Sequence, residues 1–169
     1  MNRLFKFTRI ILALMFTLGV IGFSASTAFA APPERLTWSA SFSFEDDVTC
    51  SGPVSINPSV TVQQTDFYDK NGVLTTRLLH WNEQDTFIAN GVTLVGDMFQ
   101  FSEHIQYDST GTVISDWADG VAERIPLPNG GLVFISAGRI DWLNHSGFAL
   151  SADIGNPGDV AAFCAAFGQ

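Results

Sequence analysis

Apolar and hydroxyl-bearing side chains alternate without a break from Leu36 to Phe44. Every second residue of this stretch is apolar, and the residues between them are threonine or serine. Successive side chains of a β-strand point to opposite faces of a sheet. The stretch therefore predicts a strand with one buried face and one solvated face.

Short turn signals separate further strand-like segments. Asp69-Lys70-Asn71-Gly72, Asn90-Gly91 and Asp108-Ser109-Thr110-Gly111 contain residues that tolerate positive φ. The expected strands are Leu36–Phe44, Val60–Tyr68, Val73–Trp81, Gln84–Ala89, Val92–Val95, Met98–Tyr107, Thr112–Ile125 with an interruption at Gly120, Leu132–Leu143 and Phe148–Ile154. Because no helical pattern separates them, we expect an all-β fold with an antiparallel sheet. A meander β-barrel of about eight strands is favoured over a β-sandwich, since closure removes the edges of a sheet.

Only the C-terminal segment has a helical pattern. Asp159 is a suitable N-cap, and the segment Val160–Phe167 places its larger apolar side chains on one stripe. This segment contains Cys164, and the only other cysteine is Cys50, just after the first expected strand. We expect a disulfide bond that fastens the helix over one end or face of the sheet, with two free thiols as the alternative.

The first thirty residues have the layout of a secretory signal peptide. Basic residues precede an uncharged apolar run from Ile10 to Phe23, and small residues lead up to Ala30. We expect cleavage after Ala30, with an uncleaved membrane anchor as the alternative. Residues 31–169 would then form a single β domain, secreted or periplasmic.

The mature chain would be strongly acidic. Removing the signal peptide leaves five basic residues against all seventeen acidic ones, a net charge of −12. Such a surface repels the phosphates of nucleic acids and of anionic membranes. We therefore expect no nucleic-acid partner, and no membrane partner after cleavage.

Motifs that carry known chemistry are missing from the sequence. There is no glycine-rich phosphate loop, no His-Glu-x-x-His and no Gly-x-Ser-x-Gly. The three histidines (His80, His104 and His145) lack metal-ligand spacing. We expect neither a cofactor nor a metal.

Glu103 is the candidate catalytic residue. It lies on the expected strand Met98–Tyr107, and its neighbours on the same face are aromatic or aliphatic. If that face is buried, its carboxyl group must be paired, hydrogen-bonded or protonated. Buried ionisable groups in cavities are candidates for function. The alternatives are a β-bulge that turns Glu103 outward, or a structural partner such as Arg77 or Arg139.

His80, Trp81 and Tyr107 are the candidates for ligand binding. His80 and Trp81 begin a polar cluster, His80–Asp85, at an expected strand end, where functional groups often lie. Tyr107 shares the face of Glu103. For the polar cluster, a solvated turn is the alternative.

Two other polar segments have structural interpretations. Arg139 and Asp141 lie two residues apart on one expected strand, which predicts an ion pair. The segment Asp116–Gly120 lacks the alternating oxygen ligands of an EF-hand, so we expect a turn there.

The placement of the cysteines resembles that of small exported bacterial all-β proteins of unknown function. In those proteins one cysteine lies near the first strand and the other in a C-terminal Asp-Val-x-x-x-Cys segment, here Asp159 to Cys164. The resemblance implies export and an all-β fold, but no activity. A likeness to lipocalin-type barrels is architectural only.

Three classes of function remain open. The first is a non-enzymatic β-barrel that binds a small apolar ligand or a surface partner. The second is an enzyme of the cyclase or isomerase kind that uses Glu103 as acid or base. The third is a carbohydrate-binding module that uses an exposed tryptophan. The direction of the Glu103 side chain separates the second class from the others.

Overall fold

The computed structural model describes residues 32–128, 130–145, 152–156 and 158–169, with the side chains of residues 134–136 excepted. The expected signal peptide lies outside the described residues, as does most of the expected strand Phe148–Ile154. Within the described ranges, no helix has both the length and the apolar character needed to cross a membrane.

Among the described residues, nine strands form one antiparallel sheet that precedes a short helix. The elements are β1 (Glu34–Ser41), β2 (Phe44–Asp46), β3 (Val54–Tyr68), β4 (Leu74–Ala89), β5 (Val92–Val95), β6 (Phe99–Tyr107), β7 (Val113–Pro126), β8 (Leu132–Asp141), β9 (Ile154–Asn156) and α2 (Val160–Ala166). Neighbouring strands run in the order β1-β3-β4-β6-β7-β8-β9, while β2 pairs with β3 and β5 with β4. The prediction of an all-β antiparallel fold is confirmed.

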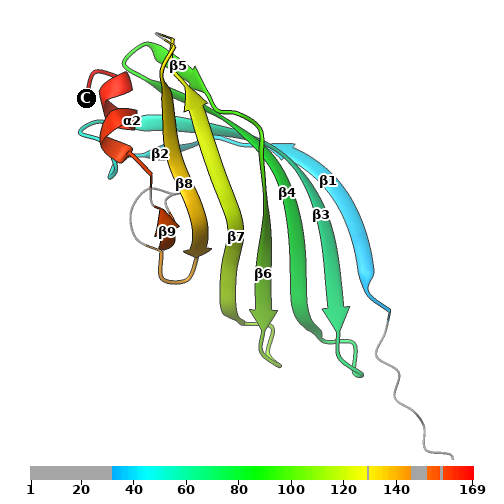
Figure 1. Cartoon of the computed structure of the whole chain (residues 1–169). Coiled ribbons are helices and arrows are strands. Elements are labelled where there is room, and N and C mark those ends of the chain that lie inside the picture. The colour runs from blue at the N-terminus through cyan, green and yellow to red at the C-terminus, as the bar shows by residue number, and fades with distance from the viewer. Residues whose placement is uncertain (1–31, 129, 146–151, 157) are drawn as a thin grey trace, which may run out of the picture.

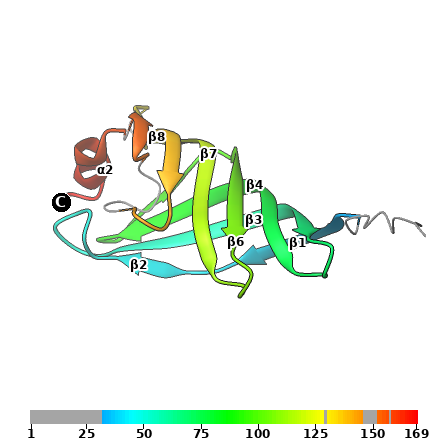
Figure 2. The same cartoon turned by 90° about the horizontal axis from the view of Figure 1, so that it is seen from below.

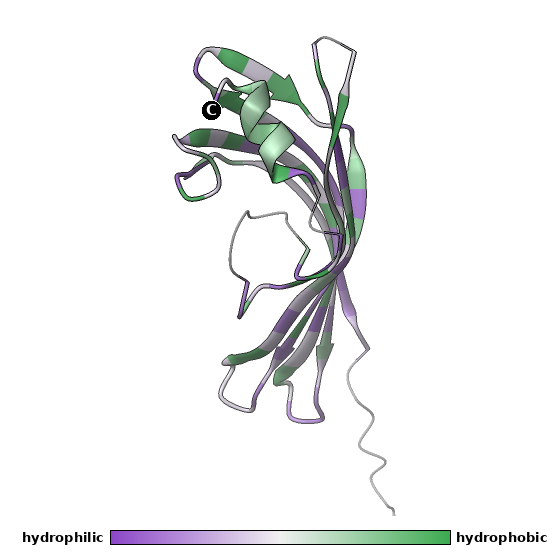
Figure 3. Ribbon diagram, turned by 60° about the vertical axis from the view of Figure 1, so that its left-hand side comes forward, coloured by the Kyte–Doolittle hydropathy of each residue, from purple (hydrophilic) through white to green (hydrophobic). Residues whose placement is uncertain are grey.

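The sheet is strongly curved but does not close (Figures 1 and 2). In the described part of the chain, β1 pairs only with β3 and β9 pairs only with β8. The predicted barrel is therefore not confirmed. A closed ring would require the two end strands to meet, but β9 has only three residues and the chain then continues into α2, which lies on the concave side of the sheet (Figure 3).

Burial alternates along the strands and identifies the concave face. In β3, every second residue from Val54 to Val62 is buried. The register continues this face onto β4, where Phe87 lies opposite Ile56 and Trp81 lies opposite Val62. Apolar side chains from several strands and from α2 form the main core on this side, and their removal from water is the main stabilising contribution.

The helix α2 begins and packs as its sequence predicts. The carboxylate of Asp159 accepts a hydrogen bond from the backbone N–H of Ala162 at 2.9 Å, which caps the first turn. Phe163 is buried and meets Phe87 of β4 edge to face, with ring centroids 5.2 Å apart. These aromatic contacts fix the helix over one end of the concave face.

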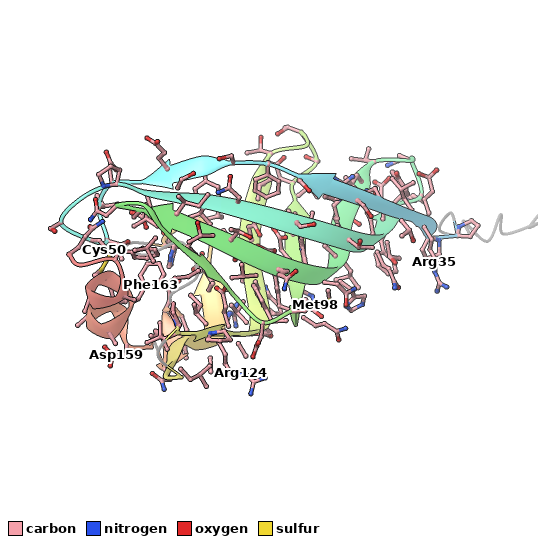
Figure 4. All side chains as sticks on the ribbon, turned by 90° about the horizontal axis from the view of Figure 1, so that it is seen from above. Arg35, Cys50, Met98, Arg124, Asp159 and Phe163 are labelled. Atoms are coloured by element: carbon pink, nitrogen blue, oxygen red, sulfur yellow. A yellow bond between two sulfur atoms is a disulfide. The ribbon has the colours of Figure 1, made fainter. Side chains whose placement is uncertain are left out.

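A disulfide bond joins Cys50 to Cys164, with their Cα atoms 5.5 Å apart. It connects the loop after β2 to α2, so the predicted bond and its role in fastening the helix are confirmed. Figure 4 places Cys50 and Phe163 at the same end of the molecule, with Arg35 at the other. The helix and its fastening thus occupy one end only.

Two strands are longer than the sequence predicted. β3 begins at Val54 and runs through Pro58, whereas the expected strand began at Val60. Pro58 lies beside the gap between β1 and β2, where its carbonyl accepts a hydrogen bond from the backbone N–H of Phe42. Because no strand pairs with β3 at this gap, the N–H that proline lacks is not needed for a hydrogen bond between strands. β4 is also unbroken, and it places the polar segment His80–Asp85 in the middle of a strand rather than at its end. The turn expected at Asp116–Gly120 is likewise part of a strand, β7.

A β-bulge at Gly120 changes which residues of β7 face inward. The register shifts between Asp119 and Val121, and Gly120 has φ of 82°, a conformation that glycine adopts readily. Ala118 is buried before the bulge, whereas Val121 and Glu123 are buried after it. The extra residue therefore turns Glu123 into the interior.

Candidate functional site

A pocket of about 270 Å³ opens on the concave face, and no residue of α2 lines it. The lining residues come from β2, β3, β4, β6 and the segments that adjoin β2 and β8: Phe42, Phe44, Pro58, Trp81, Glu83, Phe101, Glu103 and Trp142. Six of these eight are apolar or aromatic, and the other two are glutamates. Apolar hollows that contain a few polar groups are typical of small-molecule sites.

Trp81 and Phe101 form the floor of the pocket. They lie opposite each other on β4 and β6, and their rings stack with centroids 5.6 Å apart and planes within 5° of parallel. Trp38 of β1 meets Trp81 edge to face at 5.6 Å. The register of the four neighbouring strands β1, β3, β4 and β6 therefore builds a rigid aromatic platform from three of them.

Phe42 and Phe44 form the rim. Their rings stack with centroids 6.3 Å apart, and the two residues are 48% and 37% exposed. They continue the concave-face row of β1, in which Leu36 is 56% exposed. The sequence predicted burial for this row, and for these three residues that prediction is wrong, because α2 covers only the other end of the sheet.

Glu103 faces the pocket from β6. The indole N–H of Trp81 donates a hydrogen bond to Glu103 Oε2 at 2.8 Å. Glu103 also forms a hydrogen bond with the carboxyl group of Asp116, which requires that one of the two carries a proton. Burial, and secondarily Asp116, raise the pKa of Glu103 to about 7. Its catalytic role stays a prediction.

Glu103 is not turned outward and has neither expected arginine as its partner, although the indole N–H of Trp81 is a structural partner. The side chain is not turned outward, since it lines the pocket. Arg77 instead pairs with Asp66 at 2.7 Å, and the guanidinium of Arg139 lies over the ring of Trp117.

Glu83 and Asp85 are two further acidic residues that face inward from β4. They are 7% and 0% exposed. Burial, and secondarily Asp85, raise the pKa of Glu83 to about 8, and burial raises the pKa of Asp85 to about 6. The Asp85 oxygens have no N–H or hydroxyl donor among the described residues. A hydrogen bond between the carboxyl groups of Asp85 and Glu83 would need a proton on one of them.

Glu123 adds a third buried carboxyl group beside this pair. It is 0% exposed, and neither of its oxygens has a hydrogen-bond partner among the described residues. Burial, followed by the charges of Asp85 and Glu83, raises its pKa well above the usual value. A Cβ at Gly96 would lie 2.5 Å from Glu123 Oε1, so the position of the carboxyl group depends on glycine there.

We call Glu83, Asp85, Glu103, Asp116 and Glu123 the interior carboxyl cluster. The ion pairs found among the described residues are Arg77–Asp66, Arg124–Asp97 and His145–Asp153, and none of them includes a member of this cluster. The described residues also contain no group of side chains that could hold a metal ion. The interior carboxyl cluster is therefore without a cation from the described part of the chain.

Of the three predicted binding residues, only Trp81 lines the pocket. His80 is exposed on the convex face, where its Nδ1 lies 2.8 Å from the hydroxyl of Ser102. There it lines a separate polar hollow with residues such as Gln63 and Gln100. Tyr107 lies at the end of β6 and lines neither hollow.

The predicted ion pair between Arg139 and Asp141 is wrong. The Arg139 guanidinium carbon lies 4.2 Å from the centroid of the Trp117 ring. His104 stacks on the same ring with centroids 4.0 Å apart. These contacts lie on the convex face, which separates Arg139 from the pocket.

Sequence reasoning missed Glu83, Asp85 and Glu123. A signal for the first two was available, because Trp81, Glu83, Asp85 and Phe87 alternate with polar residues and so continue one strand face. No comparable signal existed for Glu123, whose direction depends on the bulge in β7.

No family model, curated protein or solved structure matches this chain.

Proposed function

We propose that this chain is an exported, non-enzymatic binding protein that holds a small apolar molecule in its concave pocket. The observation that carries the proposal is a pocket with six apolar or aromatic lining residues on a face that α2 leaves open. A ligand there would remove exposed parts of Phe42 and Phe44 from water, which is favourable in proportion to the area buried. Grouped apolar side chains at a surface hollow are characteristic of binding sites.

We place this activity outside the cytoplasm, in the periplasm or the medium. The disulfide between Cys50 and Cys164 supports that location, because such bonds persist in oxidising compartments. The N-terminal segment with its expected cleavage after Ala30 supports it independently.

Native mass spectrometry of protein purified from its own host tests the proposal. We expect an additional mass from one bound small molecule, which is lost in a Trp142→Ala variant. The matched control is Trp117→Ala, which removes a tryptophan from the convex face and should retain the ligand. A wild-type protein that carries no ligand, and whose tryptophan fluorescence does not respond to a neutral naphthalene alcohol, would contradict the proposal.

A second candidate function is acid–base catalysis of the cyclase or isomerase kind. It is favoured by Glu103 and Glu83, whose pKa values of about 7 and about 8 allow proton transfer near neutral pH. If the recovered ligand is converted by the wild-type protein, Glu103→Gln should abolish conversion even when the variant is saturated with ligand. Unchanged turnover in that variant would exclude Glu103 as the acid or base.

No structural observation favours the carbohydrate-binding alternative. Trp81 and Trp142 line the apolar pocket, Trp38 packs on Trp81, and the ring of Trp117 lies between His104 and Arg139. None of the four tryptophans is fully exposed, so they form no open row on which sugar rings could stack.

A further inference from the structure

The pocket combines aromatic surfaces with carboxyl groups that lack a counterion. Glu83 is 7% exposed and lines the pocket, and the neighbouring group that most raises its pKa beyond the effect of burial is another carboxyl group, that of Asp85. Glu103 lines the same pocket and has Trp81 and Asp116 as partners. A buried carboxylate without a cation is costly, which keeps these groups protonated up to about neutral pH. A cationic ligand would stabilise their ionised forms.

The register places the two glutamates on either side of the aromatic platform. Trp81 and Phe101 are directly opposed on β4 and β6. Glu83 follows Trp81 by two residues on β4 and lies opposite Phe99, whereas Glu103 follows Phe101 by two residues on β6 and lies opposite Leu79. Because the strands are antiparallel, the two glutamates lie beyond opposite ends of the stacked pair on the same face of the sheet.

Aromatic faces and carboxylates both attract cations. The face of an indole or phenyl ring carries negative charge density, and a cation above it is stabilised most strongly where water is excluded. The net charge of −12 expected for residues 31–169, with five basic and seventeen acidic residues, also attracts cations to the molecule as a whole. A bare metal ion does not fit, because the described residues offer no set of metal ligands and the other pocket walls are apolar.

We propose that the concave pocket binds a small organic cation, an amine or quaternary ammonium compound with an apolar body. The cationic group lies over Trp81 and Phe101 between Glu83 and Glu103, and the apolar body packs against Phe42, Phe44 and Trp142. This inference rests on the proposed function, since it assigns a ligand class to the same pocket.

The neighbouring charges make binding sensitive to pH. Glu83 interacts electrostatically with Asp85 on β4, Glu103 on β6 and Glu123 on β7. Glu103 interacts in the same way with Asp116 on β7, and Asp116 with Asp141 of β8. All of these groups are acidic. A bound cation therefore favours loss of protons from Glu83 and Glu103, and by linkage the cation binds more tightly as the pH rises through their pKa values.

A matched pair of probes tests the inference. Benzyltrimethylammonium is a permanent cation, and neopentylbenzene is its uncharged carbon isostere. Titrations followed by tryptophan fluorescence at about pH 8.5 should show the cation binding about tenfold more tightly than the isostere, the ratio expected for a partly desolvated cation–aromatic contact with a carboxylate nearby. At about pH 5.5 this preference should fall to less than about threefold, because both glutamates are then protonated.

Substitutions assign the effect to the two glutamates. The double variant Glu83→Gln/Glu103→Gln should bind both probes with the affinity that the wild type has for the isostere. The control is Glu45→Gln on β2, whose side chain is exposed and lines neither hollow, and it should keep the full preference. Circular dichroism checks that each variant is folded.

Each outcome is decisive. If the isostere binds as tightly as the cation at high pH, the inference about ligand charge is overturned while the proposed function stands. If neither probe binds and the protein from its own host also carries no ligand, the proposed function fails together with the inference. A preference for the cation that persists in the double variant would assign the cation to another site and overturn the inference.

Discussion

The concave face has two halves built from the same alternating pattern, but one half is buried and the other is partly exposed. At one end, Phe87 of β4 is 0% exposed under Phe163 of α2. At the other, Phe42 and Phe44 are 48% and 37% exposed at the rim of a pocket. The alternation of a strand defines which face is apolar, but whether that face is buried depends on a covering element elsewhere in the chain. Here one short helix covers one end and leaves a pocket open at the other.

Removing the disulfide between Cys50 and Cys164 should cause the largest loss of stability, and it acts on the covered half. In a Cys50→Ser/Cys164→Ser variant we expect the free energy of unfolding to fall by about 4 kcal/mol, because the bond closes a loop of more than about 100 residues across a sequence separation of 114. Urea denaturation under oxidising conditions measures the change. Wild-type protein after reduction should match the variant, and unchanged stability in the variant would refute the role of the bond.

Equivalent truncations in the two halves should differ sharply. Phe163→Ala should cost about 3–4 kcal/mol of unfolding free energy, since it leaves a cavity under α2. Phe42→Ala should cost less than about 1 kcal/mol, because the side chain is already half exposed. Urea denaturation of both variants tests this difference. The binding assays should show the reverse order, because Phe42→Ala should lower the affinity for the ligand and Phe163→Ala should change it little. Equal losses of stability in the two variants would contradict the comparison.

The acidic interior should make the protein less stable as the pH rises. Folding raises the pKa of Glu83 from 4.5 to about 8 and of Glu103 from 4.5 to about 7, so the folded state binds more protons than the unfolded state between these values. The resulting stabilisation is fully present below about pH 4.5 and is lost as the pH rises through about 7 to 8. Thermal unfolding at intervals of pH measures it. Glu83→Gln should flatten the profile, and a stability that rises over this range would contradict the assignment.

The helix cap gives the smallest expected effect. Asp159→Ala removes the hydrogen bond to the N–H of Ala162 and should cost about 1 kcal/mol. Urea denaturation should resolve this loss, and Asp159→Asn, which keeps a capping oxygen, should recover most of it. Because the cap lies on the covered half, ligand binding should not change in either variant. Loss of binding on removal of the cap would show that the two halves are coupled.

Sequence patterns predicted the parts of the fold that depend on local chemistry. The alternation from Leu36 identified the face that contains the pocket rim, and Asp159 identified the start of the helix. The disulfide bond could be predicted because the sequence contains only two cysteines. Glu103 could be recognised because it interrupts an otherwise apolar strand face.

The remaining parts depend on long-range packing. The composition of the His80–Asp85 segment is that of a solvated turn, and only its pairing with β3 on one side and with β5 and β6 on the other places Glu83 in the interior. The direction of Glu123 depends on a bulge between β7 and β8. The open edge at β1 could not be predicted, because closure depends on whether the last strand reaches the first.

The disulfide also determines the order in which the molecule can be completed. Cys50 is synthesised 114 residues before Cys164, which at the usual rate of translation is an interval of roughly ten seconds. During that time its thiol can react only with small thiols or with another molecule, since the chain contains two cysteines in all. These two cysteines therefore have no alternative internal pairing, and we expect the covalent by-product of incomplete folding to be a dimer cross-linked through Cys50.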